Sequence, residues 1–375
     1  MMTSRLDGTQ GTSTVQWVDP YGVYRTSLSD LVERHVQGRI SVIIPCRNSE
    51  EFLHQAISSA LNQAYESIEV IVVDDASTDR SVSVAASFGD RVTLITRDSQ
   101  GGACVARNDG LQHASGEFVQ FLDADDYLLP EALRSRVGRA NSRDIPFGRR
   151  LQIDTRLRRT TPHRLRGWGR MPQLEFLAAK GFNTMEPLHL RAALCSVGGF
   201  DESLPQAQEK DLHLRLALSG YTFCYRAVDV GVTRIHEGVG RISNVAWGEI
   251  DPMRHFNISM HWMSLLPENL DSDERARIEG ALCRRVSVSA AHLWRSGHQD
   301  LALLYLEQLH QRVPYWRPSG LVSLLGGLDT LAGRRRQLRV TSAAGVVKTA
   351  RAALADSALR RRAGHRDADS IGGRN

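Results

Sequence analysis

Residues 40–45 read Ile-Ser-Val-Ile-Ile-Pro, a short run of β-branched apolar residues that a proline ends. Such a run is typical of a strand buried on both faces of a sheet. Similar apolar runs follow at 68–73, 92–96 and 118–122. The sequence therefore predicts at least four buried strands in its first third.

Amphipathic segments separate these strands. Apolar side chains between Phe52 and Leu61 recur at spacings of three and four, and Asn48 and Ser49 are positioned to cap this helix. A second such segment follows Gly102. Strands that alternate with helices are typical of βαβ units, in which helices cover both faces of a parallel sheet. We expect an α/β fold with a mostly parallel sheet sandwiched by helices.

The alternation lapses in the arginine-rich stretch 141–170, which predicts a solvated loop. Order returns with a helix expected at 211–218, which Gly220 ends as a C-cap. From about residue 252 onward the periodicity is helical and no strand is indicated, so we expect a helical C-terminal extension. The predicted organisation is a lead-in, an α/β domain, a helical region and a basic tail, at 1–38, 39–250, 251–333 and 334–375.

The composition is that of a globular protein, with 375 residues, 42% hydrophobic and 24% charged, and excludes collagen-like, disordered and disulfide-scaffold classes. The formal charge of +5 is unevenly distributed. The segment 334–375 carries +8 and the segment 141–170 carries +7, which leaves −10 on the rest. An acidic body with two basic segments argues against a general nucleic-acid-binding surface.

Targeting and redox signals are absent from the sequence pattern. No apolar run approaches the ~18 residues that span a bilayer, and the first 30 residues lack a basic start followed by an apolar core, so we expect a cytoplasmic protein. The five cysteines are odd in number and never form a C-x-x-C pair, which predicts buried, reduced thiols rather than disulfides or a zinc site.

Acidic residues follow two of the predicted strands, at the sheet edge where ligands bind in open α/β folds. Asp123 and Asp125 would place two carboxylates close together, which a divalent cation such as Mg²⁺ or Mn²⁺ can neutralise. Asp74 and Asp75 could accept hydrogen bonds from a nucleobase or ribose. Each pair could instead be a solvated turn or helix cap. No glycine-rich phosphate loop follows Pro45, so metal and basic side chains would have to hold a phosphate.

In order and spacing, a set of motifs over about residues 39–240 resembles the family 2 glycosyltransferases, which have the GT-A nucleotide-sugar-binding fold. The matching segments are Ser41-Val42-Ile43-Ile44-Pro45-x-x-Asn48, Val73-Asp74-Asp75-Ala76-Ser77-Thr78-Asp79, Gly102-Ala103 with Ala106-Arg107-Asn108-x-Gly110, Phe121-Leu122-Asp123-Ala124-Asp125-Asp126, Val197-Gly198-Gly199-Phe200-Asp201, and Glu209-x-Asp211-Leu212-x-Leu214-Arg215-Leu216-Ala217.

The resemblance implies roles for individual residues. Pro45 and Asp75 would line the nucleoside pocket with Asp74 alongside, and Asp123 would approach the ribose or diphosphate. Asp125 would bind the metal. The remaining implied donor-binding positions are Asn48, Gly102 and Arg107, and His236 would approach the metal or diphosphate; by itself, a lone histidine is more often structural. Arg107 could equally pair with the neighbouring carboxylates, and Asn108 would fix the loop.

The resemblance also implies an inverting reaction, in which a base takes the proton of an acceptor hydroxyl. The acidic pair that usually precedes this helix is here Gln208-Glu209, so Glu209 inherits the role of base, with Asp211 as the alternative. The implied donor is a nucleotide sugar, UDP-linked by preference, and the acceptor a glycan or lipid-linked hydroxyl in cell-surface polysaccharide or glycoconjugate synthesis. A catalytically silent nucleotide-sugar-binding or scaffold protein is the alternative, and a nucleotidyltransferase is a third, disfavoured one.

Two hypotheses concern the basic segments. The guanidinium groups of residues 156, 158, 159, 164 and 166 would suit an anionic acceptor, although a solvated loop is the simpler interpretation. The tail at 334–375 could contact an anionic membrane surface as a basic amphipathic helix. Its apolar face is thin and rich in alanine, which favours a solvated tail instead.

Overall fold

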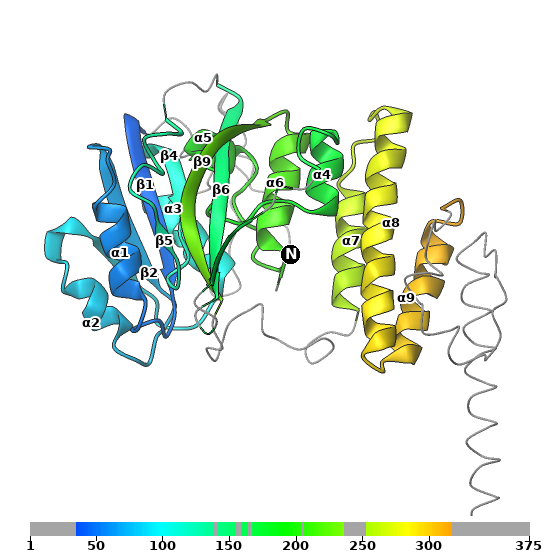
Figure 1. Cartoon of the computed structure of the whole chain (residues 1–375), viewed down its shortest axis with the longest axis horizontal. Coiled ribbons are helices and arrows are strands. Elements are labelled where there is room, and N and C mark those ends of the chain that lie inside the picture. Colours follow the sequence, from blue (N-terminus) through cyan, green and yellow to red (C-terminus); the bar gives the residue numbers. More distant parts are fainter. Residues whose placement is uncertain are drawn as a thin grey trace, which may run out of the picture. The chain divides into compact units, whose positions relative to one another are not determined.

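A computed structural model describes residues 35–137, 142–154, 156, 159–163, 165, 167–204, 206–235 and 253–316 (Figure 1). The chain forms two compact units. The first consists of Met1–Arg164, Asn183–Gln208 and Ser219–Ile235, and the second of Leu165–Phe182, Glu209–Leu218 and His236–Asn375. All of the strands in the described residues belong to the first unit.

A five-stranded sheet organises the first unit, in the order β3-β2-β1-β4-β8. The strands are β1 (Val36–Cys46), β2 (Ile68–Asp74), β3 (Thr93–Thr96), β4 (Gly116–Phe121) and β8 (His189–Leu190). The first four run parallel, and β8 pairs antiparallel with β4. All four strands predicted from the apolar runs form, and the mostly parallel sheet is confirmed.

Helices cover both faces of this sheet. They are α1 (Leu53–Leu61), α2 (Ser81–Ala86), α3 (Ala103–His113) and α5 (Arg191–Ser196), with a 3-10 turn at Gly89–Arg91. Alternate residues of β1 face α1, in one core with Leu53 and Ile57. On the other face α3 packs so closely that a Cβ atom on Gly110 would lie 2.4 Å from Cγ2 of Ile43. The predicted sandwich is therefore confirmed.

The predicted cap of α1 is wrong. The N-cap residue of this helix is Phe52, which makes no side-chain capping hydrogen bond. The Asn48 side chain instead accepts from the backbone N–H of Thr78 at 2.8 Å, and Ser49 Oγ donates to the carbonyl of Arg47. The Asn48 side chain cross-links the neighbouring loops after β1 and β2, whereas the Ser49 hydroxyl is used within its own loop.

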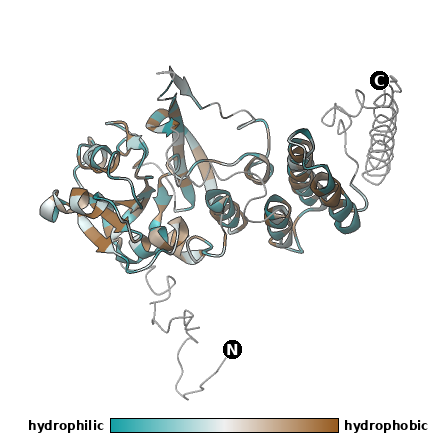
Figure 2. Ribbon diagram, turned by 90° about the horizontal axis from the view of Figure 1, so that it is seen from below, coloured by the Kyte–Doolittle hydropathy of each residue, from teal (hydrophilic) through white to brown (hydrophobic). Residues whose placement is uncertain are grey.

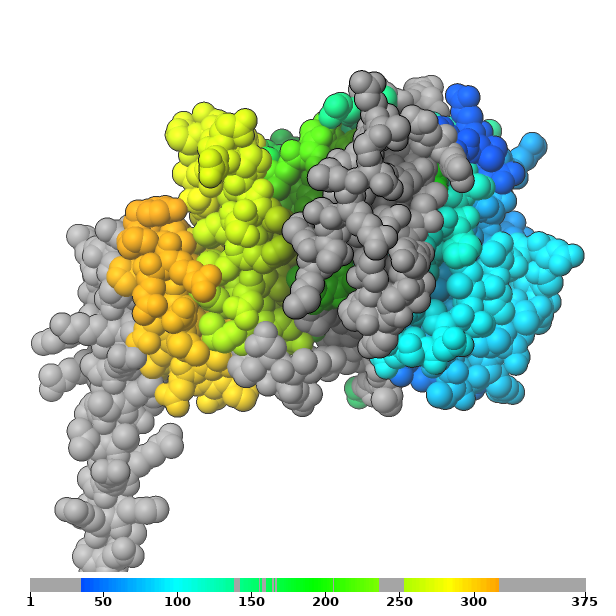
Figure 3. Space-filling model, turned by 180° about the vertical axis from the view of Figure 1, so that it is seen from behind, coloured from blue at the N-terminus to red at the C-terminus, as the bar shows by residue number. Residues whose placement is uncertain are grey.

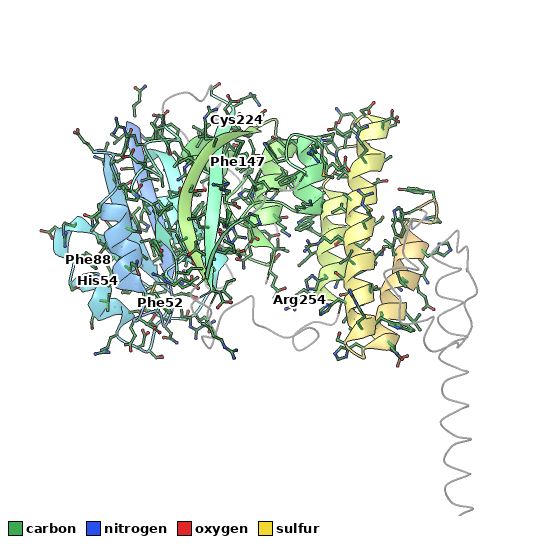
Figure 4. All side chains as sticks on the ribbon, viewed as in Figure 1. Phe52, His54, Phe88, Phe147, Cys224 and Arg254 are labelled. Atoms are coloured by element: carbon green, nitrogen blue, oxygen red, sulfur yellow. The ribbon has the colours of Figure 1, made fainter. Side chains whose placement is uncertain are left out.

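A second sheet has the order β5-β9-β6-β7, formed by β5 (Tyr127–Leu128), β6 (Asp144–Asp154), β7 (Arg159–Pro162) and β9 (Thr222–Ile235). Strands β6 and β9 are the long neighbouring ribbons in Figure 1, and Figure 4 labels Phe147 of β6 and Cys224 of β9 near one end of them.

The solvated loop expected at 141–170 is therefore wrong for its described part. Arg149 Nε donates to Asp229 of β9 at 2.6 Å, and Arg150 Nε lies 3.8 Å from the buried Glu186 carboxylate. The arginine-rich segment can form strands because acidic side chains distant in sequence, Asp229 and Glu186, pair with its arginines. Of the arginines considered for acceptor binding, Arg156 is exposed, the backbone of Arg159 begins β7, and residues 158, 164 and 166 lie outside the described residues.

The second unit is helical in its described part, as expected from the periodicity. It contains α4 (Gln173–Ala179), α6 (Gln208–Leu218) apart from its first residue, α7 (Arg254–Ser264), α8 (Ser272–Arg295) and α9 (Gln299–Arg312). Asp271 caps α8 by accepting from the N–H groups of Asp273 and Glu274. Apolar side chains of α7, α8 and α9 share one core, as the brown inner faces in Figure 2 and the packed yellow and orange helices in Figure 3 show.

The described helices include none that is long and apolar enough to cross a membrane. The tail 334–375 and residues 1–34 of the lead-in lie outside the described residues. All five cysteines are free; four are buried, as expected, and Cys224 is half-buried.

Candidate active site

Three carboxylates gather directly after β4. Oxygen atoms of Asp123, Asp125 and Asp126 all lie within 4.8 Å of one another. Asp126 is buried, and the other two are half-buried. Like charges this close repel unless a cation neutralises them, and an all-oxygen set suits Mg²⁺ or Mn²⁺. The donor set therefore fits a hard divalent ion, with Asp126 added to the two residues expected from the sequence.

Arg107 of α3 is the cationic partner of this cluster. Its Nη2 donates to Oδ1 of Asp123 at 2.7 Å, and its Nη1 donates to Oε1 of Gln208 at 3.0 Å. The guanidinium also lies over the Phe200 ring, 5.2 Å from its centroid. Of the two roles considered for Arg107, the structure shows the pairing with a carboxylate. This buried side chain fixes Asp123 at the sheet edge.

Arg234, near the end of β9, holds the other two acids. Its backbone N–H donates to Oδ1 of Asp126 at 3.0 Å, and its Nη1 donates to the carbonyl of Asp125. The guanidinium stacks over Tyr127 at 4.8 Å and over Phe52 at 5.2 Å. The sequence does not indicate a role for Arg234, because nothing in the local pattern shows which loop β9 reaches. His236 itself lies outside the described residues.

Asp75 joins the end of β2 to the loop before α3. Its two carboxylate oxygens accept from the backbone N–H groups of Gly101 and Gly102, each at 2.7 Å. Arg97 Nε lies 3.1 Å from the same carboxylate, and its Nη1 donates to Asp109. Gly102 adopts a φ of +89°, which suits glycine at this N-cap position. The buried Asp75 therefore orders the loop, and the contribution of Arg97 was missed because β3 carries no motif.

Asp74 has one engaged and one unengaged oxygen. Oδ2 accepts from the N–H of Ser77 at 3.0 Å, whereas the buried Oδ1 has no hydrogen-bond partner among the described residues. Pro45 is buried beside it, where β1 pairs with Val73 of β2. Because buried polar atoms are nearly always satisfied, an orphaned carboxylate oxygen at a ligand-binding edge indicates a position for a ligand donor.

Backbone strain is found in the loops around these acids. In the described residues, the non-glycine positions with positive φ are Asn48 at 46°, Ala76 at 57° and Ala207 at 58°. Asparagine tolerates this region, but each alanine costs about 1 kcal/mol there. Such outliers concentrate at functional sites. Two of them follow β1 and β2, and the third precedes Gln208.

Asn108 confirms the expected structural role. Its Oδ1 accepts from the N–H of Phe200 and its Nδ2 donates to the carbonyl of Phe200, both at 2.9 Å, with a further bond to Glu202. The side chain thus fixes the 200–202 loop that carries the ring beneath Arg107.

Cys46, at the end of β1, is unsuited to nucleophilic chemistry. Burial raises the pKa of its thiol from 9.0 to about 11, so the thiol stays protonated at neutral pH.

The two candidate bases, both in the second unit, differ sharply. The fully buried Asp211 carboxylate accepts from Arg215 Nε at 2.8 Å and from Trp262 Nε1 at 3.2 Å, and His261 Nε2 lies 3.3 Å away. Glu209 is half-buried, and no residue in the described ranges hydrogen-bonds to its carboxylate. A carboxylate already saturated by donors is poorly placed to take a proton, so the surroundings favour Glu209 over Asp211.

Comparisons with known proteins agree with the predicted family. The family described as glycosyl transferase family 2 matches residues 41–195. An uncharacterized glycosyltransferase of Haemophilus influenzae is 41% identical over 101 residues, 26% of this chain and 40% of the relative. The Escherichia coli UDP-Glc:alpha-D-GlcNAc-diphosphoundecaprenol beta-1,3-glucosyltransferase WfgD is 37% identical over 109 residues, 29% of this chain and 43% of the relative. The chain thus matches less than half the length of these curated relatives.

A solved structure has a similar fold. The crystal structure of Staphylococcus aureus TarS residues 1–349, in complex with UDP-GlcNAc, superposes with a TM-score of 0.64 and 19% identity, covering 86% of this chain and 92% of that one. Residues 41–195 therefore match glycosyl transferase family 2, and the chain has the GT-A fold.

Proposed function

We propose that the chain is a metal-dependent, inverting glycosyltransferase that moves a sugar from a UDP-sugar to an acceptor hydroxyl. The observation that carries the proposal is the cluster of Asp123, Asp125 and Asp126 beside Arg107, at the carboxyl edge of a parallel sheet. The UDP-Glc in the name of the relative WfgD supports a UDP-linked donor.

The nucleoside part of the donor would bind at the ends of β1 and β2. The orphaned Oδ1 of Asp74 offers an acceptor for a base or ribose donor, and the buried Pro45 supplies an apolar wall. Asp75 orders the loop at Gly102 through two backbone hydrogen bonds. Asn48 cross-links the two loops and so keeps the pocket in shape.

The diphosphate part would meet the acidic cluster. Asp125, with Asp123 and Asp126, would hold a divalent ion, which when bound supplies Lewis-acid stabilisation of charge on the leaving diphosphate. Arg107 holds the Asp123 carboxylate in place. Arg234 holds the loop that carries Asp125 and Asp126. His236, as the next residue but one, is proposed as a further contact to the metal or diphosphate.

Glu209 is the proposed general base, which removes the proton of the acceptor hydroxyl as that oxygen attacks the anomeric carbon. General-base assistance is typically worth about 10² to 10⁴ in rate. Glu209 directly follows Gln208, whose side chain Arg107 holds, and the strained Ala207 precedes both. The carboxylate is thus attached to a constrained stretch of chain while remaining without a hydrogen bond from the described residues.

The acceptor is proposed to be a glycan or lipid-linked hydroxyl in polysaccharide or glycoconjugate synthesis. The diphosphoundecaprenol-linked acceptor in the name of WfgD supports this class. We propose a cytoplasmic location.

The experiment is product analysis with a panel of nucleotide sugars, Mn²⁺ and a candidate acceptor. Release of nucleoside diphosphate together with a product of inverted anomeric configuration is expected. Release of pyrophosphate from a nucleoside triphosphate and a sugar phosphate, assayed in parallel, would instead identify a nucleotidyltransferase. Donor binding without turnover, across a panel of acceptors, would identify a silent nucleotide-sugar-binding protein.

A further inference from the structure

The second unit contains a group of basic side chains that the proposed reaction does not use. Lys210 comes from α6, Arg254 and His255 from the start of α7, and Arg285 and His292 from α8. The other four groups each act electrostatically on His255. The structure thus gathers charges from three helices around one position.

Arg254 is the most unusual member. Its side chain is only 3% exposed, yet its Nε and Nη1 atoms are buried without a hydrogen-bond partner among the described residues. Figure 4 labels it at one end of α7. A buried guanidinium is normally paired, because an unpaired charge in a protein interior is costly. Two unpaired donors on one buried arginine therefore indicate a missing anion.

Arg285 and Lys210, like Arg254, lack enough nearby negative charge among the described residues to balance their own. The Arg285 guanidinium stacks on the buried Trp262 ring at 5.1 Å, and its Nε also has no hydrogen-bond partner in the described part of the chain. Burial, followed by repulsion from Arg285, lowers the pKa of Lys210 from 10.5 to about 8. Glu209 is the acid that acts on both cations. One carboxylate cannot balance three basic groups.

The start of α7 adds to the positive electrostatic potential around these side chains. The helix begins at Arg254 with no acidic residue in its first turn and no side-chain capping hydrogen bond at Met253. The first turn of a helix presents unpaired N–H groups and the positive end of the helix dipole. Burial and the neighbouring cations lower the pKa of His255 from 6.5 to about 4, so at neutral pH this imidazole is neutral and can donate or accept a hydrogen bond.

We propose that Lys210, Arg254 and Arg285 form a binding site for a phosphate or diphosphate group. Guanidinium forks suit phosphate oxygens because two parallel N–H groups can donate to them, and an ammonium group adds a compact charge. The site needs no metal, unlike the acidic cluster after β4. Two sources could supply the group: the diphosphate of a nucleotide, or a phosphate on the acceptor.

The test is calorimetric titration of the full-length chain with inorganic pyrophosphate in EDTA, which removes any contribution from a metal bound at Asp123 or Asp125. Saturable binding at one site is expected, with a rise in the melting temperature, because a ligand that binds the folded state stabilises it. Arg254→Gln should weaken this binding by about tenfold or more, since it removes charge-assisted hydrogen bonds.

The matched control is Arg284→Gln. Arg284 is the neighbour of Arg285 on α8, but its side chain is 55% exposed and lies 3.4 Å from Glu175. This variant loses the same charge and should bind pyrophosphate as the wild type does. Lys210→Met keeps an unbranched apolar stem at position 210 and serves as a second test variant if Arg254→Gln does not fold.

Competition between UDP and pyrophosphate in EDTA distinguishes the two sources of the bound group, a nucleotide diphosphate and a phosphate on the acceptor. Displacement of pyrophosphate by UDP would assign the site to a nucleotide diphosphate, and independent binding of both would assign it to a phosphate on the acceptor. The proposal is overturned if pyrophosphate does not bind saturably, or if Arg284→Gln weakens binding as much as Arg254→Gln or Lys210→Met. Because no sugar transfer is measured, this result is independent of the proposed transferase activity.

Discussion

Three arginines determine where the acidic side chains of the candidate site lie. Arg107 pairs with Asp123, Arg97 with Asp75, and Arg234 holds the backbone of the loop that carries Asp125. A buried arginine keeps its charge and offers several fixed donors, so it can position a carboxylate without covering all of its oxygens. The sequence motif identifies the acids, whereas their arginine partners come from other strands and helices.

The first prediction separates the two candidate bases. Glu209→Gln should lower the transfer rate by about 10²-fold or more, because its carboxylate is proposed to take the proton of the acceptor hydroxyl. Asp211→Asn should instead destabilise the protein by about 3 kcal/mol, because it disrupts the hydrogen-bonded ion pair between the fully buried Asp211 carboxylate and the partly exposed Arg215.

Thermal unfolding and steady-state rates of both variants check this pair of expectations. A Glu209→Gln enzyme with wild-type turnover would remove Glu209 from the role of base. An Asp211→Asn protein that is fully stable but inactive would transfer that role to Asp211.

At the scale of helices and strands, local periodicity predicts the elements whose own apolar pattern fits a buried strand or one face of a helix. The four parallel strands and the helix at Asp211 are of this kind. The strand β6 is not, because Arg149 and Arg150 become compatible with a sheet only through Asp229 and Glu186. The failure of the predicted cap has the same origin, since Asn48 bonds to Thr78 in the next loop.

Helix α3 carries a prediction at this scale. Gly110→Ala should lower the free energy of unfolding by about 1–3 kcal/mol, because the added methyl group would overlap Cγ2 of Ile43 on the sheet. Gly280→Ala is the matched control on α8, where the nearest atom to an added Cβ is Nη1 of Arg284 at 3.5 Å. That variant should be stabilised by about 0.5–1 kcal/mol, as expected for alanine in a helix.

Denaturant unfolding of both variants measures the two effects. Equal stability changes of the same sign would contradict the close packing of α3 on β1.

At the scale of the whole molecule, the net charge of +5 conceals an acidic body and basic segments. The candidate site likewise combines acidic side chains with arginines. Its carboxylates could be predicted from the sequence because they follow the strands directly, and so could the loop-fixing role of Asn108. The participation of Asp126, Arg97 and Arg234 could not, because it depends on how strands distant in sequence come together.

Acid stability is predicted from two histidines, the buried His189 and the half-buried His255, one in each unit. Burial lowers the pKa of His189 from 6.5 to about 3 and that of His255 to about 4. The unfolded chain therefore binds protons at these positions below pH 6.5 while the folded chain does not, so stability should fall as the pH decreases from 6.5 to about 4. His255→Gln should make this decline shallower. The exposed His113→Gln is the matched control and should leave the slope unchanged.

Melting temperatures measured across that pH range test this expectation. A steeper decline in His255→Gln than in the wild type would contradict the assigned direction of the pKa shift.

Binding of UDP with and without Mn²⁺ tests the central claim most directly, because the claim is that the acids after β4 hold a metal against a nucleotide diphosphate. Calorimetric titration of the wild type should give UDP affinity at least about tenfold higher with Mn²⁺ than in EDTA, since charge-assisted contacts of this kind are worth a factor of that size. Asp125→Ala should abolish the difference and leave the EDTA affinity unchanged. Equal UDP affinity with and without the metal, or an undiminished effect of Mn²⁺ in Asp125→Ala, would contradict the account.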